Sequence, residues 1–553
     1  MHDLRPAMSA DLTERADRLL GYGGFHRMAW ARFYGEDDGA FPRFAERADG
    51  YELIDVQGRS FVDWTNGGGP VILGYNHPAV EEAVRAQLAH KAGPTLTLMH
   101  PVELEVASKL TEMVPCAEMV AFGKNGSDAV TAAVRIARAA TRREVILHHG
   151  GHGFHDWFVS SLGAAGVPQS IGSLVHSFPY NDVAALEELF DRLDGQVAAI
   201  VMEPVNIVMP ETGYLESVRE LAHERGALLI FDEMVTAFRL APGGAQELFG
   251  VTPDLAALGK GIANGMPLSA VVGRREYMRH LPHVAYGMTF RGETLSLAVA
   301  RAVLGVIRAQ PVAEHLAAVG TAVREGFERA CATHGVIAQL NGPPARMSFA
   351  FGDDAAVPPE RLETVFLREC ARNGVLTNGN ILPSFAHDQE AIDRTMSAFD
   401  EALEATVELL RAGRAAMLEA IRSGVADEDG PGGYLDAARE EGGRLLVRGW
   451  LLPKNRAPDA VEFVSSDGRQ LLADPVKRPD VAQAFPSADG AEDCGFAAAL
   501  PAEMFARGDD YDFTLQAREG DEVVFACRIL RPQDGQRAVT VRTGRFENRT
   551  LHI

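Results

Sequence analysis

The chain has 553 residues and a formal net charge of −23 at pH 7, because 76 acidic side chains outnumber 53 Lys and Arg side chains. This length predicts two or three domains, and the 46% apolar and 23% charged content is typical of a globular protein. The acidic balance argues against nucleic acid as a partner, since phosphate binding needs a positive surface. No apolar run reaches the roughly 20 residues of a membrane helix, and no signal-peptide pattern opens the chain, so we expect no membrane partner and a cytoplasmic location.

The N-terminal region predicts a helix, a group of short strands and a glycine-rich loop. Residues 9–20, SADLTERADRLL, have a capping serine and apolar residues on one face, which predicts a helix. Residues 41–63 alternate apolar and polar side chains between turn signals and predict short strands. The stretch WTNGGGPVILGYNHP at 64–78 leads into a predicted helix at 78–91, and its triple glycine is by itself most simply a flexible bend.

The segment FGKNGSDA, residues 122–129, opens a predicted Ala-rich helix that continues to about residue 141. Unpaired N–H groups and the positive end of the dipole at a helix N-terminus attract anions such as phosphate. Ser127 or Asp128 could equally well cap this helix. The local sequence leaves the anion site and the simple cap equally open.

Three apolar runs predict buried parallel strands, at 144–148, 198–204 and 228–231, with a helix at about 213–226 between the second and the third. Glu203 and Asp232 follow two of these strands, at the carboxyl edge where open α/β sheets bind ligands. Lys260 lies between two glycines, 28 residues after Asp232 (260 − 232). A carboxylate at a strand end with a lysine nearby suggests pyridoxal phosphate chemistry.

Histidines are concentrated in HHGGHGFHDWF, residues 148–158. They lack a carboxylate companion at ligand spacing on a regular element, so we predict no metal site. Five scattered cysteines have neither disulfide nor zinc spacing, which predicts buried reduced thiols.

The whole stretch from Leu228 to Gly273 contains FDEMVTAFR, then GGAQELFGVTPDL, then LGK and NGMP. It resembles the class III (subgroup II) pyridoxal-phosphate aminotransferases, and within them the glutamate-1-semialdehyde 2,1-aminomutase branch. The resemblance extends more thinly from about Gly39 to about Leu403. It implies the α/β fold of fold type I transferases, with pyridoxal 5′-phosphate as cofactor. It also implies that Asp232 holds the pyridinium proton and that Lys260 forms the Schiff base.

The resemblance also assigns residues to the cofactor. Gly126 and Ser127 match the family's phosphate cup, and Glu203 lies near the cofactor. Thr289, in YGMTFRGETLSLA, matches the threonine that crosses to the neighbouring subunit's phosphate, which implies a homodimer with shared active sites. Gly151 replaces the aromatic that stacks on the cofactor ring, so either His152 stacks there or the ring face is left open.

On the substrate side, this chain departs from the family. Gly68 replaces an aromatic that lies against the substrate, which suggests a wider pocket. The late motif ILPSFAH at 381–387 is present, but Asn380 stands near the place of the mutase's acidic residue. Arg32 is the nearest match to the arginine that binds the substrate carboxylate, with Arg27 and Arg43 as rivals.

We predict four parts along the chain: an N-terminal arm with small strands at 1–64, a large cofactor-binding domain at 65–311, a small domain at 312–426, and an accessory domain at 440–553. The polar break ADEDGPGG and the short alternating strands beyond it favour a β-sandwich. Its RGWLLP opening weakly resembles β-sandwich appendages of polysaccharide-assembly enzymes. A glycan or a carrier is therefore a candidate partner.

Three functional hypotheses follow. The first is an aminotransferase that moves an amino group by a ping-pong reaction from an amino acid donor to a carbonyl acceptor larger than glutamate semialdehyde. The second is an aminomutase, or another pyridoxal-phosphate lyase or epimerase. The third is a non-catalytic assembly or glycan-binding module.

Overall fold

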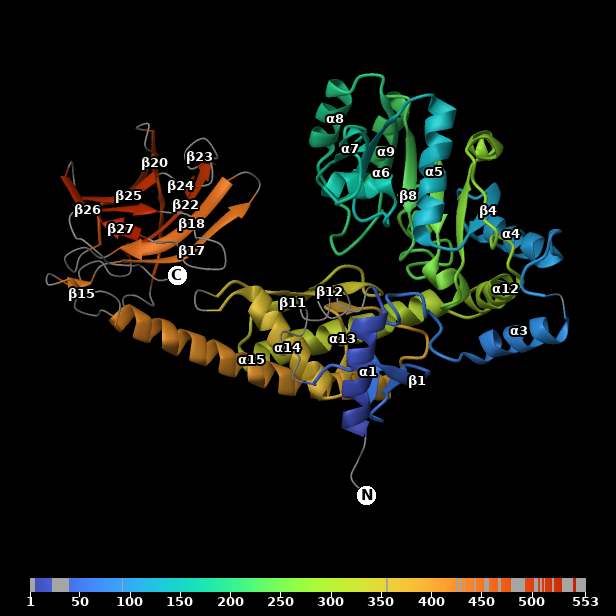
Figure 1. Ribbon diagram of the computed structural model, residues 1–553, viewed down its shortest axis with the longest axis horizontal. Helices are drawn as coiled ribbons and strands as arrows, with labels where there is room; N and C mark the ends of the chain where they lie inside the picture. The colour runs from blue at the N-terminus through green and yellow to red at the C-terminus, as the bar shows by residue number, and fades with distance from the viewer. Residues whose placement is uncertain are drawn as a thin grey trace. The chain divides into compact units, whose positions relative to one another are not determined.

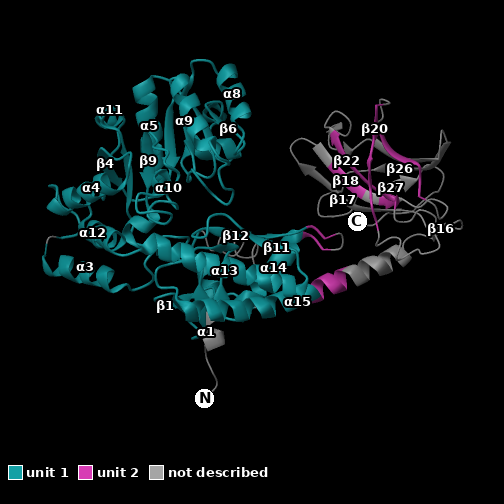
Figure 2. Cartoon of the chain, turned by 180° about the vertical axis from the view of Figure 1, so that it is seen from behind, with its two compact units in different colours: residues 1–352, 359–407 teal, residues 353–358, 408–553 magenta. Residues whose placement is uncertain are grey.

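The computed structural model describes two compact units, residues 1–352 with 359–407 and residues 353–358 with 408–553 (Figure 2). The sequence predicted four parts, which is a finer division than these two units, so the division into four stays a prediction. The described residues are 5–21, 39–91, 93–354, 357–423, 426–427, 430–431, 433–441, 444–451, 457–465, 469–478, 493–501, 506–507, 510–511, 513–519, 522–529 and 541–543.

The first unit is built on a seven-stranded sheet with the order β4-β10-β9-β8-β7-β5-β6. The strands β9, β8, β7, β5 and β6 are parallel, and β10 is antiparallel to both β9 and β4. The predicted mostly parallel sheet is therefore confirmed. Its strands are β4 (Met119–Gly123), β5 (Val145–His149), β6 (Val175–Ser177), β7 (Val197–Met202), β8 (Leu228–Asp232), β9 (Leu255–Leu258) and β10 (Ser269–Gly273).

Helices cover both faces of this sheet, as the alternation of its buried side chains requires. Along β8, Leu229 and Phe231 belong to one core cluster, whereas Leu228 and Ile230 belong to the other. The helix α5 (Gly126–Thr141) lies along β8 in Figure 1 and contributes small alanines to the second cluster. The first cluster takes side chains from α4 (Pro101–Met113), α8 (Val183–Arg192), α9 (Tyr214–Glu224) and α12 (Thr294–Ala309), and the second also from α6 (Asp156–Val159) and α11 (Arg275–Met278).

Two smaller sheets join segments that are far apart in the sequence. The sheet β1-β2-β3-β13 pairs Val62 with Val375, and the sheet β11-β12-β14 pairs Ser348 with Asn380. Phe327, Phe366 and Phe399 pack together beside them. The strands are β1 (Ala45–Asp49), β2 (Glu52–Asp55), β3 (Ser60–Asp63), β11 (Ala338–Asn341), β12 (Met347–Phe351), β13 (Val375–Leu376) and β14 (Asn380–Ile381).

The helices predicted at 9–20 and 78–91 are present, each within a few residues of its expected bounds. The N-terminal helix α1 (Arg5–Leu19) begins four residues before the predicted start at Ser9. The other helices are α3 (Pro78–Ala89), α7 (Gln169–Gly172), α10 (Ala245–Phe249), α13 (Val312–His334), α14 (Pro359–Arg372) and α15 (Gln389–Ser423), with 3₁₀ turns η1 (Ser160–Leu162), η2 (Lys260–Ala263) and η3 (Leu281–His283).

The C-terminal unit is built from strands, as predicted. Two sheets have the orders β17-β18-β22-β21 and β20-β19-β25-β26-β27. Phe463 of the second sheet contacts Phe496 of the first with ring centroids 6.1 Å apart, and both side chains are buried, so the two sheets face each other as in a sandwich. The strands are β15 (Ala426–Asp427), β16 (Gly430–Pro431), β17 (Gly433–Glu441), β18 (Arg444–Leu451), β19 (Ala460–Ser465), β20 (Gln470–Leu472), β21 (Asp474–Val476), β22 (Gly495–Pro501), β23 (Ala506–Arg507), β24 (Asp510–Tyr511), β25 (Phe513–Glu519), β26 (Glu522–Ile529) and β27 (Val541–Thr543).

Among the described residues, no single helix has the length and apolar character needed to cross a membrane. The helices α12 and α13 meet these criteria only when taken together, and a bend of 73° separates them. Cys116, Cys331, Cys370 and Cys494 are buried, as the sequence led us to expect.

Candidate active site

The candidate site lies at the carboxyl edge of the large sheet. The neighbouring strands β7, β8 and β9 end there. Glu203 directly follows β7, Asp232 is the last residue of β8, and Lys260 follows the end of β9 after Gly259. These three residues line one cavity of about 560 Å³. The cavity is lined by Pro70, Lys124, Asn125, Gly126, Ser127, Val130, Gly151, His152, Gly153, Glu203, Asp232, Met234, Val235, Lys260, Gly265, Met266, Pro267, Leu268 and Arg346.

Lys260 is the first residue of the 3₁₀ turn η2 and has a left-handed backbone, with φ of +43°. Burial lowers the pKa of its amine, and the positive charges of Arg346 and Arg239 lower this pKa further. The negative charges of Glu203 and Asp232 oppose this shift only in part. A larger share of Lys260 is therefore the neutral, nucleophilic amine than at an exposed lysine.

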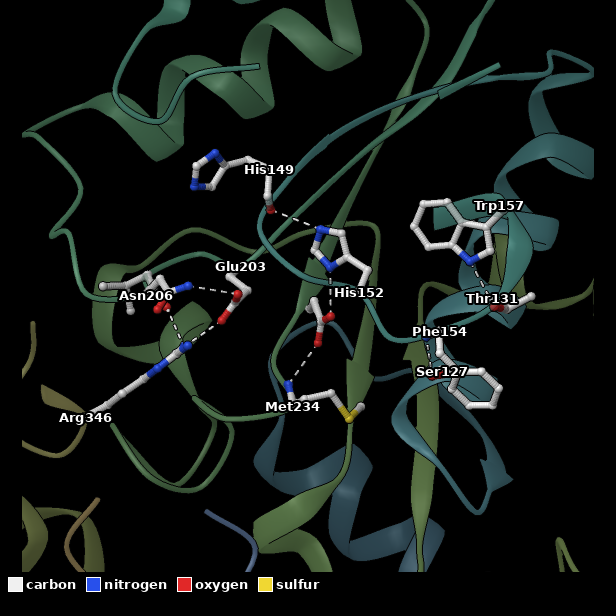
Figure 3. A network of polar contacts seen from close by, with 12 residues as sticks. Ser127, Thr131, His149, His152, Phe154, Trp157, Glu203, Asn206, Met234 and Arg346 are labelled. Carbon is white, nitrogen blue, oxygen red and sulfur yellow. Dashed lines mark hydrogen bonds and ion pairs between the residues drawn. The ribbon is translucent and has the colours of Figure 1, made fainter. Parts of the chain in front are cut away.

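Asp232 is buried and has partners on both carboxylate oxygens. Its Oδ1 accepts the backbone N–H of Met234 at 3.1 Å, and its Oδ2 lies 2.9 Å from Nδ1 of His152. The Nε2 of His152 lies 3.0 Å from the carbonyl oxygen of His149, so Nε2–H must donate there (Figure 3).

The side chain of His152 is fixed by several contacts. Both of its ring nitrogens are engaged, and its ring packs against Trp157 and Phe158. A Cβ atom added at Gly151 would meet no atom within 4 Å. The two alternatives that the sequence left open, stacking by His152 or an open ring face beside Gly151, both stay predictions.

The N-terminus of α5 forms another wall of the cavity. The backbone N–H of Asn125 donates to the Asp128 carboxylate at 2.9 Å, so the cap is formed by Asn125 and Asp128. Ser127 has a different partner, because its Oγ accepts the N–H of Phe154 at 3.1 Å. A Cβ atom at Gly153 would lie 2.1 Å from that Oγ, so only glycine allows this approach.

A partly buried ion pair lies on another side of the cavity. Nη1 of Arg346 donates to Oε2 of Glu203 at 2.6 Å, and Oε1 of Glu203 accepts from the side chain of Asn206 at 3.0 Å (Figure 3). Sequence reasoning missed Arg346. It lies in the loop between β11 and β12, 143 residues from Glu203, and no local motif marks it.

Three residues expected at this site lie elsewhere or are not described. Gly68 and Asn380 do not line the cavity, and the Asn380 side chain donates to Asn378 at 3.1 Å. Thr289, which the resemblance assigns to the neighbouring subunit's phosphate, is exposed and does not line this cavity. Arg32, with its rival Arg27, lies outside the described residues. The part of the chain that is described contains no group of three or more His, Cys, Asp and Glu side chains arranged for a metal ion.

The residues present fit pyridoxal 5′-phosphate. The N-terminus of a 16-residue helix suits a phosphate, the buried Asp232 suits a protonated pyridine nitrogen, and Lys260 suits an aldehyde. All three groups line a single cavity of a size typical for a cofactor and a small substrate. The fold and the site thus define a pyridoxal-phosphate enzyme of fold type I.

The chain belongs to the class-III aminotransferase family, whose model matches residues 33–403. The enzyme class and the cofactor expected from the sequence are therefore confirmed. The chain is 33% identical over 420 residues to the 3-aminobutyryl-CoA aminotransferase of Cloacimonas acidaminovorans, covering 74% of this chain and 99% of that protein. It is 36% identical over 405 residues to a glutamate-1-semialdehyde 2,1-aminomutase of Roseiflexus castenholzii, covering 68% and 93%.

Solved structures agree with this assignment. The FumI protein of Sphingopyxis sp. MTA144, in its form with pyridoxal phosphate, has 30% sequence identity and a TM-score of 0.68, covering 73% of this chain and 97% of that one. An omega-transaminase from Sphaerobacter thermophilus has 27% identity and a TM-score of 0.65, covering 72% and 97%.

Proposed function

We propose that this protein is an aminotransferase that moves an amino group from an amino acid donor to a carbonyl acceptor larger than glutamate semialdehyde. The observation that carries the proposal is the open space beside Gly151 in the cavity that also holds Lys260 and Asp232. The wall that an aromatic side chain would form there is missing, so a bulkier acceptor has room. The similarity to a 3-aminobutyryl-CoA aminotransferase also supports transfer between two molecules.

The proposed roles follow from the chemistry of the residues. Pyridoxal phosphate supplies an electron sink that stabilises negative charge at the carbon next to the amine. Asp232, held by His152, keeps a proton on the pyridine nitrogen. The neutral amine of Lys260 would take the proton from the donor's carbon and, once protonated, would donate it again. Gly126, Ser127 and the α5 N-terminus hold the phosphate.

We further propose that the active enzyme is a homodimer in which Thr289 reaches the neighbouring subunit's phosphate. Thr289 is exposed here, and the next residue, Phe290, is 58% exposed. Thr294 donates to the carbonyl oxygens of Gly93 and Pro94, so the segment that contains Thr289 and Thr294 lies against the segment around Gly93 and Pro94. The second segment and the helices beside it expose the apolar side chains Leu88, Leu96, Leu98, Met99 and Leu104.

A mixing experiment tests the shared site. Lys260→Ala and Thr289→Ala subunits are co-refolded or co-expressed, and the heterodimer is isolated. If Thr289 acts across the interface, one of its two sites has both native residues, so cofactor affinity and activity exceed those of either parent. Activity no higher than the parents' average would contradict the shared site.

An aminomutase is the second candidate, because several relatives at 36–37% identity are glutamate-1-semialdehyde 2,1-aminomutases. The two functions differ in what leaves the enzyme. An aminotransferase releases a keto or aldehyde product from each amino donor in a half-reaction, whereas a mutase returns an isomer. Membership of an enzyme family leaves the non-catalytic hypothesis without support. The glycan or carrier partner and the cytoplasmic location stay predictions.

The experiment on the site uses absorbance and product analysis together. Protein loaded with cofactor is expected to absorb at about 410–430 nm and to lose this band in Lys260→Ala. Lys124→Ala is the matched control, because Lys124 also lines the cavity but forms an ion pair with Glu293 at 3.1 Å. A band that survives in Lys260→Ala would refute the assigned lysine. No carbonyl product from any donor in a panel would refute the aminotransferase.

A further inference from the structure

The guanidinium of Arg346 is only half used by the protein. Its Nη1 donates to Oε2 of Glu203 at 2.6 Å and to the carbonyl oxygen of Val205 at 3.3 Å. No hydrogen bond within the described residues uses its Nε or Nη2, and neither nitrogen is among the sealed, unpaired polar atoms. Arg346 lines the cavity, so an edge of the guanidinium remains available there.

The other cations near the cavity are already engaged. Arg239 is buried and donates to the carbonyl oxygens of Ala345, Pro383 and Gly69. Lys124 is paired with Glu293. Lys260 is the proposed nucleophile. Arg346 is therefore the cavity cation, among the described residues, that has unused donors and no other proposed role.

The pair with Glu203 orients this guanidinium. The side chains of Arg346 and Glu203 are 13% and 11% exposed, and Asn206 holds the carboxylate from the other side at 3.0 Å. A planar guanidinium held at one edge presents its remaining N–H groups in a fork that matches a carboxylate. A partly dry site strengthens such a contact compared with water.

The position suits the recognition of the amino donor. Arg346 and Lys260 line the same cavity of about 560 Å³, a size that a single small molecule can span. The charge of Arg346 also lowers the pKa of Lys260, as the second cause after burial. A donor whose amine reaches Lys260 could therefore place a carboxylate at Arg346.

We propose that Arg346 binds the carboxylate of the amino donor through Nε and Nη2, while Glu203 and Asn206 hold the guanidinium in place. Arg346 would then select amino acids over amines that lack a carboxylate. This inference rests on the proposed aminotransferase function and names its donor class. Arg32, expected from the sequence for this role, would not be needed for it.

A purely structural ion pair is the competing explanation. The bond from Arg346 to Glu203 joins the loop before β12 to the end of β7, and its loss would lower stability. Loss of a purely structural ion pair would change the affinity for acids and for their matched neutral ligands to the same extent. A comparison of the two ligand types therefore separates the explanations.

The first measurement is ligand binding by calorimetry on the cofactor-loaded protein. Butyrate carries a carboxylate and no amine, and butyramide is its neutral counterpart. Wild type is expected to bind butyrate more tightly than butyramide. The ratio of the butyramide to the butyrate dissociation constant should be about 10- to 100-fold smaller in Arg346→Gln, the range for a charge-assisted hydrogen bond. Arg346→Lys, which keeps the charge but lacks the fork, should lower this ratio less.

The second measurement is the half-reaction with 3-aminobutyrate and with 2-aminobutane, in which a methyl group replaces the carboxylate. The ratio of the two rate constants at low substrate should fall about 10- to 100-fold in Arg346→Gln. Arg301→Gln is the matched control, because Arg301 pairs with Glu105 at 2.7 Å on the surface. Its ratio should equal that of wild type.

The outcomes are distinct. If wild type releases a carbonyl product but Arg346→Gln keeps the wild-type ratio and the butyrate preference, this inference is overturned and the aminotransferase stands. A wild type that binds butyramide as well as butyrate overturns it too. If no donor yields a carbonyl product, the proposed function fails, while butyrate binding still reports on Arg346 separately.

Discussion

Nδ1 of His152 lies 2.9 Å from Oδ2 of Asp232, and the other nitrogen of the same ring is committed to the carbonyl oxygen of His149. His152 thus contacts Asp232 through one ring nitrogen and the backbone of His149 through the other. The other oxygen of Asp232 accepts the backbone N–H of Met234 at 3.1 Å. Both contacts hold the Asp232 side chain in one orientation toward the cavity.

His152→Ala is expected to weaken cofactor binding about tenfold, because it removes a charge-assisted hydrogen bond from a buried carboxylate. The dissociation constant is measured by titrating apoprotein with pyridoxal phosphate. His223→Ala is the control, since Nε2 of His223 makes an equal 2.9 Å contact with Asp254 and His223 does not line the cavity. Equal losses in both variants would indicate general destabilisation instead.

The rate of cofactor capture should depend on pH through the amine of Lys260. Burial, then the charge of Arg346, lowers the pKa of this amine from its ordinary value of 10.5, so the neutral amine appears as pH rises through a midpoint below 10.5. Arg346→Gln removes a positive charge and should move the midpoint up. Glu203→Gln removes a negative charge that raises this pKa, so it should move the midpoint down.

Stopped-flow absorbance measures the midpoint of cofactor capture in wild type and in both variants. The pH is varied between about 7 and 11, a range that brackets the reference pKa of lysine. Shifts of the same sign would contradict the electrostatic account.

Arg239→Met is expected to destabilise the first unit by on the order of 3 kcal/mol or more, because it leaves three buried carbonyl groups without a donor. The midpoint of denaturant unfolding of the apoprotein measures this loss. Arg301→Met removes only a surface ion pair and should change stability by about 0.5 kcal/mol or less. A wild-type midpoint for Arg239→Met would show that water replaces the lost donors.

Gly151→Tyr should be tolerated, since no atom lies within 4 Å of an added Cβ and the backbone does not need glycine there. A ring stacked on the cofactor is expected to tighten cofactor binding by about 0.5–1.5 kcal/mol. It should also lower the rate with large carbonyl acceptors more than with small ones. A panel of acceptors of increasing size tests this, with Gly163→Tyr, a surface glycine at φ of +66°, as a stability control for strained backbone. An unchanged size preference would remove the main support for the larger acceptor.

Local patterns of the sequence determined the frame of the site. The run Leu228–Asp232 forms β8, and the glycines around Lys260 allow its turn. Gly126 opens α5 at the cavity, so Asp232, Lys260 and the α5 N-terminus meet as expected. These residues could be placed because each lies at the end of an element whose apolar pattern fixes both its type and its direction. The mostly parallel sheet and the C-terminal β unit could be predicted for the same reason.

Only the tertiary structure decided the partners of these groups. His152 and Asp232 are 80 residues apart, and Arg346 and Glu203 are 143 apart, so no local pattern links either pair. Packing of the loops turned the His152 ring toward Asp232, brought Arg346 to the cavity, and left Gly68 and Asn380 outside its lining. The sequence by itself thus determined where the strand ends and the helix start lie, because these features are local, and its resemblance to class III aminotransferases indicated their use as a pyridoxal-phosphate site. The groups that face the substrate depend on long-range packing, so only the tertiary structure identifies them.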